Sequence, residues 1–148
     1  AEQVAEHRVA DFSLLKTICI RSRWFDWRTG TALSAFDGVE EAVLLGPANE
    51  LEAIPDGHLN WKHGFVLRAL KLAPDAAIPS HIRHEEEVIF VHRGELRIEV
   101  DGEPLELHEG DTFTTPIGSR RSFSNPGSKD CIIYITRRTD RPQAPEFT

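Results

Sequence analysis

Titratable side chains crowd into one short stretch, residues 81–94, which reads His-Ile-Arg-His-Glu-Glu-Glu-Val-Ile-Phe-Val-His-Arg-Gly. Its first seven residues hold two imidazoles, His81 and His84, and three carboxylates, the last of them Glu87. Two imidazoles and one carboxylate with open positions suit a non-haem transition metal. We therefore predict a metal site on His81, His84 and Glu87.

The apolar residues after Glu87 indicate that a β-strand positions this site. Side chains alternate between the two faces of a strand, so Glu87 and Ile89 share one face and His92 lies on the other. We expect Glu87 to point into the protein and His92 to take part in packing or a subunit contact. Glu85 and Glu86 are expected to face solvent.

The rest of the chain has the pattern of an all-β protein. From Val39 onwards, short apolar runs recur with turn residues between them, at the spacing typical of sandwiches and barrels. Residues 95–100 alternate strictly, and Asp101-Gly102 is the dipeptide of a type I′ hairpin turn. We read 73–80 as a connection that leads to His81. Residues 39–137 are thus predicted to form one jelly-roll barrel.

The two ends of the chain are less regular. Residues 1–38 are predicted to be an irregular N-terminal arm that packs on the barrel or on a partner subunit, and 138–148 a polar tail. Trp24, Phe25 and Trp27 would cover the open face of a sheet, form a subunit contact or line the rim of a pocket.

Composition limits the classes of partner. The chain has 148 residues, the size of one domain, and a formal charge of -7, so nucleic acid and anionic membranes are not expected to bind it. Cys19 and Cys131 lie in apolar runs and are expected to be buried thiols. No long apolar segment occurs, and we expect a cytoplasmic protein. The absence of methionine suggests a processed chain or a piece of a longer one.

The spacing of several residues resembles the two-part motif of the cupin superfamily. Five residues separate His81 from Glu87 and six separate Glu87 from Gly94. The second part is matched by Gly110, Pro116, Gly118 and Asn125. The resemblance implies a small, single-domain double-stranded β-helix. Cupins are commonly homodimers, and many hold iron, manganese, nickel or zinc on the histidines and the glutamate of the motif.

The chain departs from the motif at two ligand positions. Arg83 stands where the family has its second histidine, with His84 one residue later, and Arg121 stands where the second part has a histidine. In one interpretation Arg121, together with Arg83, pairs with Glu87 and replaces the metal. In the other, the metal is retained and Arg121 clamps an anionic substrate.

Two functions follow from these alternatives. The first is a metal-dependent oxidoreductase of dioxygenase or isomerising type acting on a small anionic substrate, with Glu87 and Arg121 as catalytic residues and Arg83, Arg121 and Tyr134 binding substrate. The second is a metal-free ligand-binding or regulatory module, which could belong to a larger protein. An epimerase is a more distant third, because its acid–base pair cannot be placed.

The remaining candidates are weaker. His63 could supply a missing ligand from a neighbouring strand, whereas His7, His58 and His108 are expected to be solvated. Thr112 and Thr114 share a face and are expected to pack. A homodimer is expected from the aromatic cluster at 24–27 and the apolar face of Val88 and Phe90.

Overall fold

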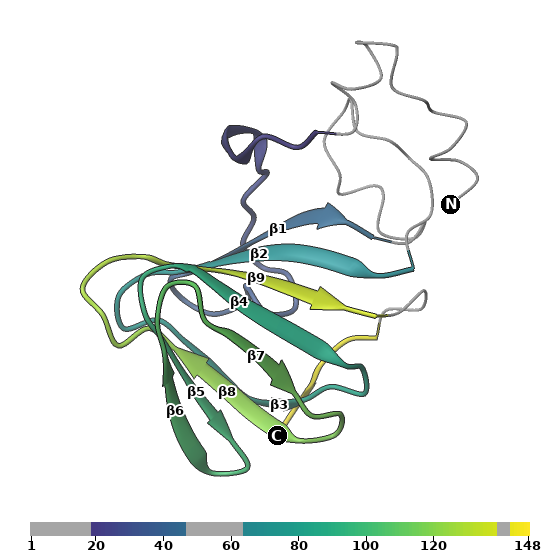
Figure 1. Ribbon diagram of the computed structural model, residues 1–148, viewed down its shortest axis with the longest axis vertical. Helices are drawn as coiled ribbons and strands as arrows, with labels where there is room; N and C mark the ends of the chain where they lie inside the picture. The colour runs from purple at the N-terminus through teal and green to yellow at the C-terminus, as the bar shows by residue number, and fades with distance from the viewer. Residues whose placement is uncertain (1–18, 47–63, 139–142) are drawn as a thin grey trace.

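The computed structural model describes residues 19–46, 64–138 and 143–148, which form two antiparallel β-sheets packed face to face (Figure 1). The first sheet has the strand order β1 (Val39–Leu45), β2 (Val66–Leu72), β9 (Cys131–Arg137), β4 (Glu87–Arg93), β7 (Thr112–Thr115). The second has the order β10 (Glu146–Phe147), β3 (Ala77–Ile82), β8 (Arg120–Ser124), β5 (Leu96–Val100), β6 (Glu103–Leu107). This architecture confirms the predicted all-β jelly roll.

Alternation along the strands builds the core between the sheets. In β4 the buried residues are Glu87, Ile89 and Val91, and the residues between them are more exposed. The same pattern in β9 buries Cys131, Ile133, Ile135 and Arg137. Buried side chains of both sheets, among them Leu70, Ile98 and Phe123, form one apolar cluster. Each of these two strands therefore carries an apolar stretch that ends in a buried charged residue.

The predicted hairpin between β5 and β6 is confirmed. Asp101 and Gly102 both have positive φ, 50° and 86°, as a type I′ turn requires. The register of the pair places Val100 opposite Glu103.

The prediction of a connection over 73–80 is wrong, because β3 begins at Ala77. Pro79 had argued against a strand, since proline cannot donate a ladder hydrogen bond. The register with β8 shifts between Ile78 and His81. Proline is tolerated at such an irregularity, and the strand continues to His81.

The described part of the N-terminal arm packs on the barrel. Leu33 is fully buried in the main core. Phe25 and Trp27 pack against Ala42 and Ala69 on the outer face of the first sheet. The short 3₁₀ helix η1 (Ser22–Trp24) precedes them. Among the described residues, no helix is long and apolar enough to cross a membrane.

Candidate functional site

Glu87 lies at the centre of a polar layer at one end of the barrel. It is fully buried, and the register places Thr115 of β7 and Arg137 of β9 directly beside it. In the second sheet, His81 of β3 pairs with Arg121 of β8, and both are fully buried. One step further along the strands the inward side chains are apolar, so the polar layer rests on the hydrophobic core.

Three guanidinium groups surround the carboxylate of Glu87. Arg121 Nη1 lies 3.6 Å from Oε1, while Arg83 Nε and Arg137 Nη1 lie 3.7 and 3.6 Å from Oε2. Charge-assisted hydrogen bonds are shorter, about 2.7–2.9 Å. The contacts are therefore electrostatic, and they pair Arg121 and Arg83 with Glu87, as one of the two interpretations expected; that the arginines replace a metal stays a prediction.

Other contacts hold two of these arginines in place. Arg121 Nη2 donates to the carbonyl of Pro116 at 2.8 Å and to Ser119 Oγ at 3.1 Å. Arg83 Nη1 donates to the carbonyl of Gln143 at 2.9 Å. Burial lowers the pKa of Arg83 to about 10, which leaves it protonated at neutral pH. Arg83 and Arg121 are therefore held in place as cations, and each has further N–H groups that take no part in these anchoring hydrogen bonds.

Several buried polar atoms of this layer have no hydrogen-bond partner among the described residues. They are Arg83 Nε, Arg121 Nε and Nη1, Arg137 Nε and Nη1, both oxygens of Glu87, Thr115 Oγ1 and His81 Nε2. Buried polar atoms are nearly always paired in native proteins, by protein, water or ligand. Water or a polar ligand would have to pair so dense a cluster of donors and acceptors.

His81 is held in one orientation. Its Nδ1 lies 2.9 Å from the carbonyl oxygen of Pro79, and its ring packs against Phe123 and Phe147 with centroids 5.5 Å away in each case. Desolvation lowers the pKa of His81 to about 4, and the charges of Arg83, Arg121 and Arg137 act in the same direction; the hydrogen bond to Pro79 opposes them. His81 is therefore a neutral imidazole at neutral pH.

This lowered pKa predicts a pH-dependent stability. Between pH 6.5 and 4 the unfolded chain binds a proton at His81 that the folded chain excludes, so acid lowers the free energy of unfolding. Relative to a His81→Phe variant, the wild type should lose about 3 kcal/mol over this range. Urea unfolding at several pH values measures the difference. Parallel curves for the two proteins would contradict it.

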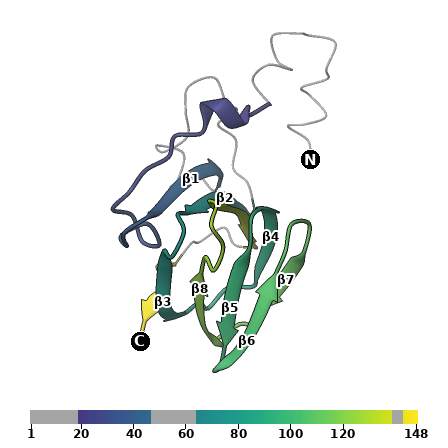
Figure 2. The ribbon, with the colours of Figure 1, turned by 90° about the vertical axis from the view of Figure 1, so that its left-hand side faces the viewer.

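The C-terminal segment covers one side of the layer. In Figure 2, β10 lies along the edge of β3, where the register pairs Phe147 with His81. Phe147 also contacts Phe36 of the arm at a centroid distance of 5.3 Å. The backbone N–H of Gln143 donates to Glu85, and that of Thr148 donates to the carbonyl of Ser80. Residues 143–148 therefore add contacts to the polar layer that the other strands of the barrel do not supply.

The predicted metal set is not brought together. His81 and Glu87 lie in the buried layer, but the His84 side chain is 48% exposed and its Nε2 lies 3.2 Å from Glu146 of β10. His84 lies between Arg83 and the buried Glu85, and it faces away from the barrel. Within the described ranges, no group of three or more histidine, cysteine or acidic residues could hold a metal ion.

The residues of the polar layer do not fit the transition metal that the family resemblance implied. A metal on Glu87 would lie close to three guanidinium groups that already contact this carboxylate. At 4 Å and an effective dielectric of 20, each unit of like charge costs about 4 kcal/mol. Arginine cannot lose its proton to relieve this repulsion. In this structure His81, His84 and Glu87 therefore do not form a metal site, and their assignment as metal ligands stays a prediction.

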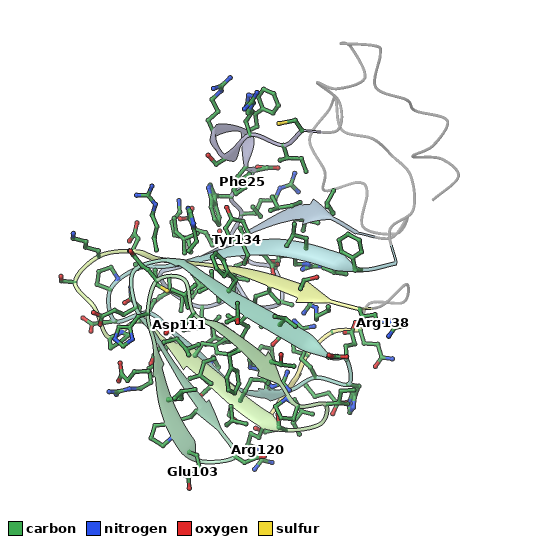
Figure 3. The ribbon with its side chains drawn as sticks, viewed as in Figure 1. Phe25, Glu103, Asp111, Arg120, Tyr134 and Arg138 are labelled. Carbon is green, nitrogen blue, oxygen red and sulfur yellow. The ribbon has the colours of Figure 1, made fainter. Side chains whose placement is uncertain are left out.

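Three further predictions are corrected. Tyr134 was expected to bind substrate, but Ile133 and Ile135 face the core, so Tyr134 lies on the outer face, where it packs against Phe25 (Figure 3). Glu85 was expected to face solvent, yet it is buried, with Oε1 4.0 Å from Arg83 Nη1. Thr112 and Thr114 share a face as expected, but both are exposed, so the prediction that they pack is wrong; Glu86 is exposed, as expected. His92 packs on Tyr134 outside the barrel, also as expected.

Sequence reasoning missed Arg137 and Thr115. The signal for Arg137 was present, because alternation from Ile133 and Ile135 places residue 137 on the same face. Thr115 is the inward neighbour of the two threonines that were considered.

His7, His58 and His63 lie outside the described residues. His108 is exposed and lines a surface pocket of about 450 Å³ near Gly94 and Lys129, at the other end of β4 from Glu87.

Comparison with known proteins identifies the fold. Residues 69–136 match the family model described as a cupin domain. No curated protein matches the chain. Among solved structures, the polyketide cyclase RemF from Streptomyces resistomycificus has a TM-score of 0.70 and 14% identity, with 88% of this chain and 84% of that chain covered. A predicted oxalate decarboxylase from Thermotoga maritima has a TM-score of 0.66 and 20% identity, covering 82% and 99%.

A cupin-2 domain protein from Rhodospirillum rubrum is similar at a TM-score of 0.66 and 17% identity, with 88% of this chain and 79% of that chain covered. At sequence identities this low, the structural similarity shows a shared fold but not a shared activity. The family match includes β4, β7, β8 and nearly all of β9, which supply Glu87, Thr115 and Arg121. The match therefore identifies residues 69–136 of this chain as a cupin domain.

Proposed function

We propose that this cupin binds a small carboxylate without a metal ion, in the polar layer around Glu87. The observation that carries the proposal is the set of unpaired, buried N–H groups on Arg83, Arg121 and Arg137. Guanidinium groups bind carboxylates through paired N–H donors and keep their charge when buried. An anion among them would satisfy donors that Glu87 approaches only to 3.6–3.7 Å.

The charge balance of the layer also favours an anion. Three guanidinium groups face the two carboxylates of Glu85 and Glu87, which leaves one formal positive charge among these residues. His81 adds no charge at neutral pH, since its pKa is lowered to about 4. A monocarboxylate would neutralise the excess. A divalent cation would increase it, which disfavours the metal-dependent oxidoreductase.

Calorimetry with the purified protein tests the proposal. We expect a panel of acetate, propionate, butyrate and oxalate, titrated in a buffer without other carboxylates, to contain at least one ligand. Its affinity should not change after treatment with a chelator. Losing a charged hydrogen-bonding partner of a buried ligand costs about 2–3 kcal/mol, so Arg121→Gln should weaken binding by roughly 30- to 150-fold.

Arg97→Gln is the matched control. Arg97 is an arginine of the same barrel, but its side chain is 51% exposed and pairs with Glu106 on the surface. This variant should bind the same ligand as tightly as the wild type. The proposal fails if no acid of the panel binds, if the chelator abolishes binding, or if Arg121→Gln binds as well as Arg97→Gln while remaining folded.

The predicted homodimer stays a prediction. Phe90 is 37% exposed on the outer face of the first sheet, beside Tyr134 in the register, and Trp24 is 44% exposed.

A further inference from the structure

His81 presents a hydrogen-bond acceptor to the polar layer. Its Nδ1 lies 2.9 Å from the carbonyl oxygen of Pro79, and a carbonyl only accepts. The proton of the neutral ring must therefore be on Nδ1, which leaves a lone pair on Nε2. Nε2 is buried and has no hydrogen-bond partner among the described residues.

The ring cannot easily turn to relieve this unpaired acceptor. Phe123 meets it edge to face at an interplanar angle of 78°, and Phe147 covers it at 49°. Exchanging the two nitrogens by a ring flip would give up the bond to Pro79. The lone pair on Nε2 is thus a fixed feature of the site.

Among the described residues, no group of the layer donates to Nε2, although Thr115 Oγ1 and Arg121 Nε are themselves without a hydrogen-bond partner. Arg121 lies opposite His81 in the β3–β8 register, so their side chains are neighbours on the same face of the sheet. Its Nη2 donates to Pro116 and Ser119, and its Nη1 contacts Glu87. The carboxylates of Glu85 and Glu87 only accept. A molecule bound in the layer can therefore supply the donor that Nε2 lacks.

We infer that the bound molecule is a hydroxycarboxylate, whose carboxylate contacts the guanidinium groups and whose hydroxyl donates to His81 Nε2. This inference rests on the proposed function and specifies its ligand. The donor is a hydroxyl rather than an ammonium group, because Arg83, Arg121 and Arg137 would repel a further positive charge. The adjacency of His81 and Arg121 places the hydroxyl close to the carboxylate, as in 2- and 3-hydroxy acids.

Matched acids that differ by one hydroxyl test the inference. The affinities of D- and L-lactate are compared with that of propionate, and those of D- and L-3-hydroxybutyrate with that of butyrate. A buried acceptor left unpaired weakens binding, so at least one hydroxy acid should bind about 10- to 100-fold more tightly than its parent acid.

The His81→Phe variant removes the acceptor and keeps a flat ring between Phe123 and Phe147. It should prefer the hydroxy acid over its parent acid by less than about 3-fold, since the hydroxyl then lacks its partner. His81→Leu serves the same purpose if the phenylalanine variant does not fold. A preference that persists in the folded variant would overturn the inference.

The two proposals fail in different ways. If the parent acids bind as tightly as the hydroxy acids in the wild type, His81 does not bind a hydroxyl group of the ligand. Only the inference of a hydroxycarboxylate ligand is then overturned. If no acid of either series binds, the carboxylate site itself is wrong and the inference falls with it. An affinity that Arg121→Gln weakens, together with a hydroxyl preference that His81→Phe abolishes, supports both.

Discussion

Replacing Glu87 by glutamine is expected to lower the free energy of unfolding by about 3–5 kcal/mol, the range for breaking a buried ion pair. Glutamine has nearly the same shape, so the loss would come from charge and not from a cavity. Three guanidinium groups would then remain in the barrel with Glu85 as the carboxylate that still contacts one of them. Urea unfolding of the two proteins at neutral pH and low salt measures the change.

An alanine at the same position provides a sharper test of the site. Glu87→Ala leaves a void beside Arg83, Arg121 and Arg137, into which formate or acetate could bring back a carboxylate. Ligand at 100 times its dissociation constant stabilises a protein by about 2.7 kcal/mol. Formate should therefore raise the stability of Glu87→Ala more than chloride at the same ionic strength does.

The control for both variants is Glu99→Gln, which changes an exposed carboxylate on β5. Surface substitutions of this kind alter stability by about 0.5 kcal/mol or less. A Glu87→Gln variant as stable as Glu99→Gln would show that the guanidinium groups do not need the carboxylate. Equal effects of formate and chloride on Glu87→Ala would show that the site does not select a carboxylate.

A Gly94→Ala variant is expected to lose about 3 kcal/mol or more of unfolding free energy, from backbone strain together with overpacking. Gly94 has a φ of 78°, and an added Cβ would lie 2.7 Å from the carbonyl oxygen of Asp130 and 3.1 Å from Cys131 Cα. These neighbours are backbone atoms at the start of β9, so they can move only if the strand moves. The turn after β4 and the strand that carries Arg137 would both be displaced.

Gly102→Ala separates the two causes. Gly102 has a similar φ of 86°, but an added Cβ would meet nothing within 4 Å. This variant should lose only the backbone term, about 1–2 kcal/mol. Denaturant unfolding of both variants gives the comparison. Equal losses would mean that the close approach of Gly94 to Asp130 has no energetic effect.

The fold could be predicted because its signals are local. Alternation in β4 and β5, the Asp101-Gly102 turn and the spacing of Glu87, Gly94, Gly110 and Asn125 all depend on near neighbours in the chain. Gly94 shows why the spacing carries information: its lack of a side chain lets the chain pass against Asp130, far along the sequence. The strand at Ala77 was missed because Pro79 normally interrupts a strand, and the irregular register that tolerates it depends on β8.

The candidate site was only partly predictable. The sequence by itself determined that Glu87 faces the barrel and that Arg83 and Arg121 replace imidazoles, because alternation and motif spacing decide both. Only the tertiary structure decided the rest. His84 turns outward to Glu146, Glu85 turns inward, and Arg137 arrives from a strand fifty residues after Glu87. These positions depend on loop conformation and on the register between strands that lie far apart in the sequence. No local sequence pattern records the distances between the carboxylate of Glu87 and the three guanidinium groups around it.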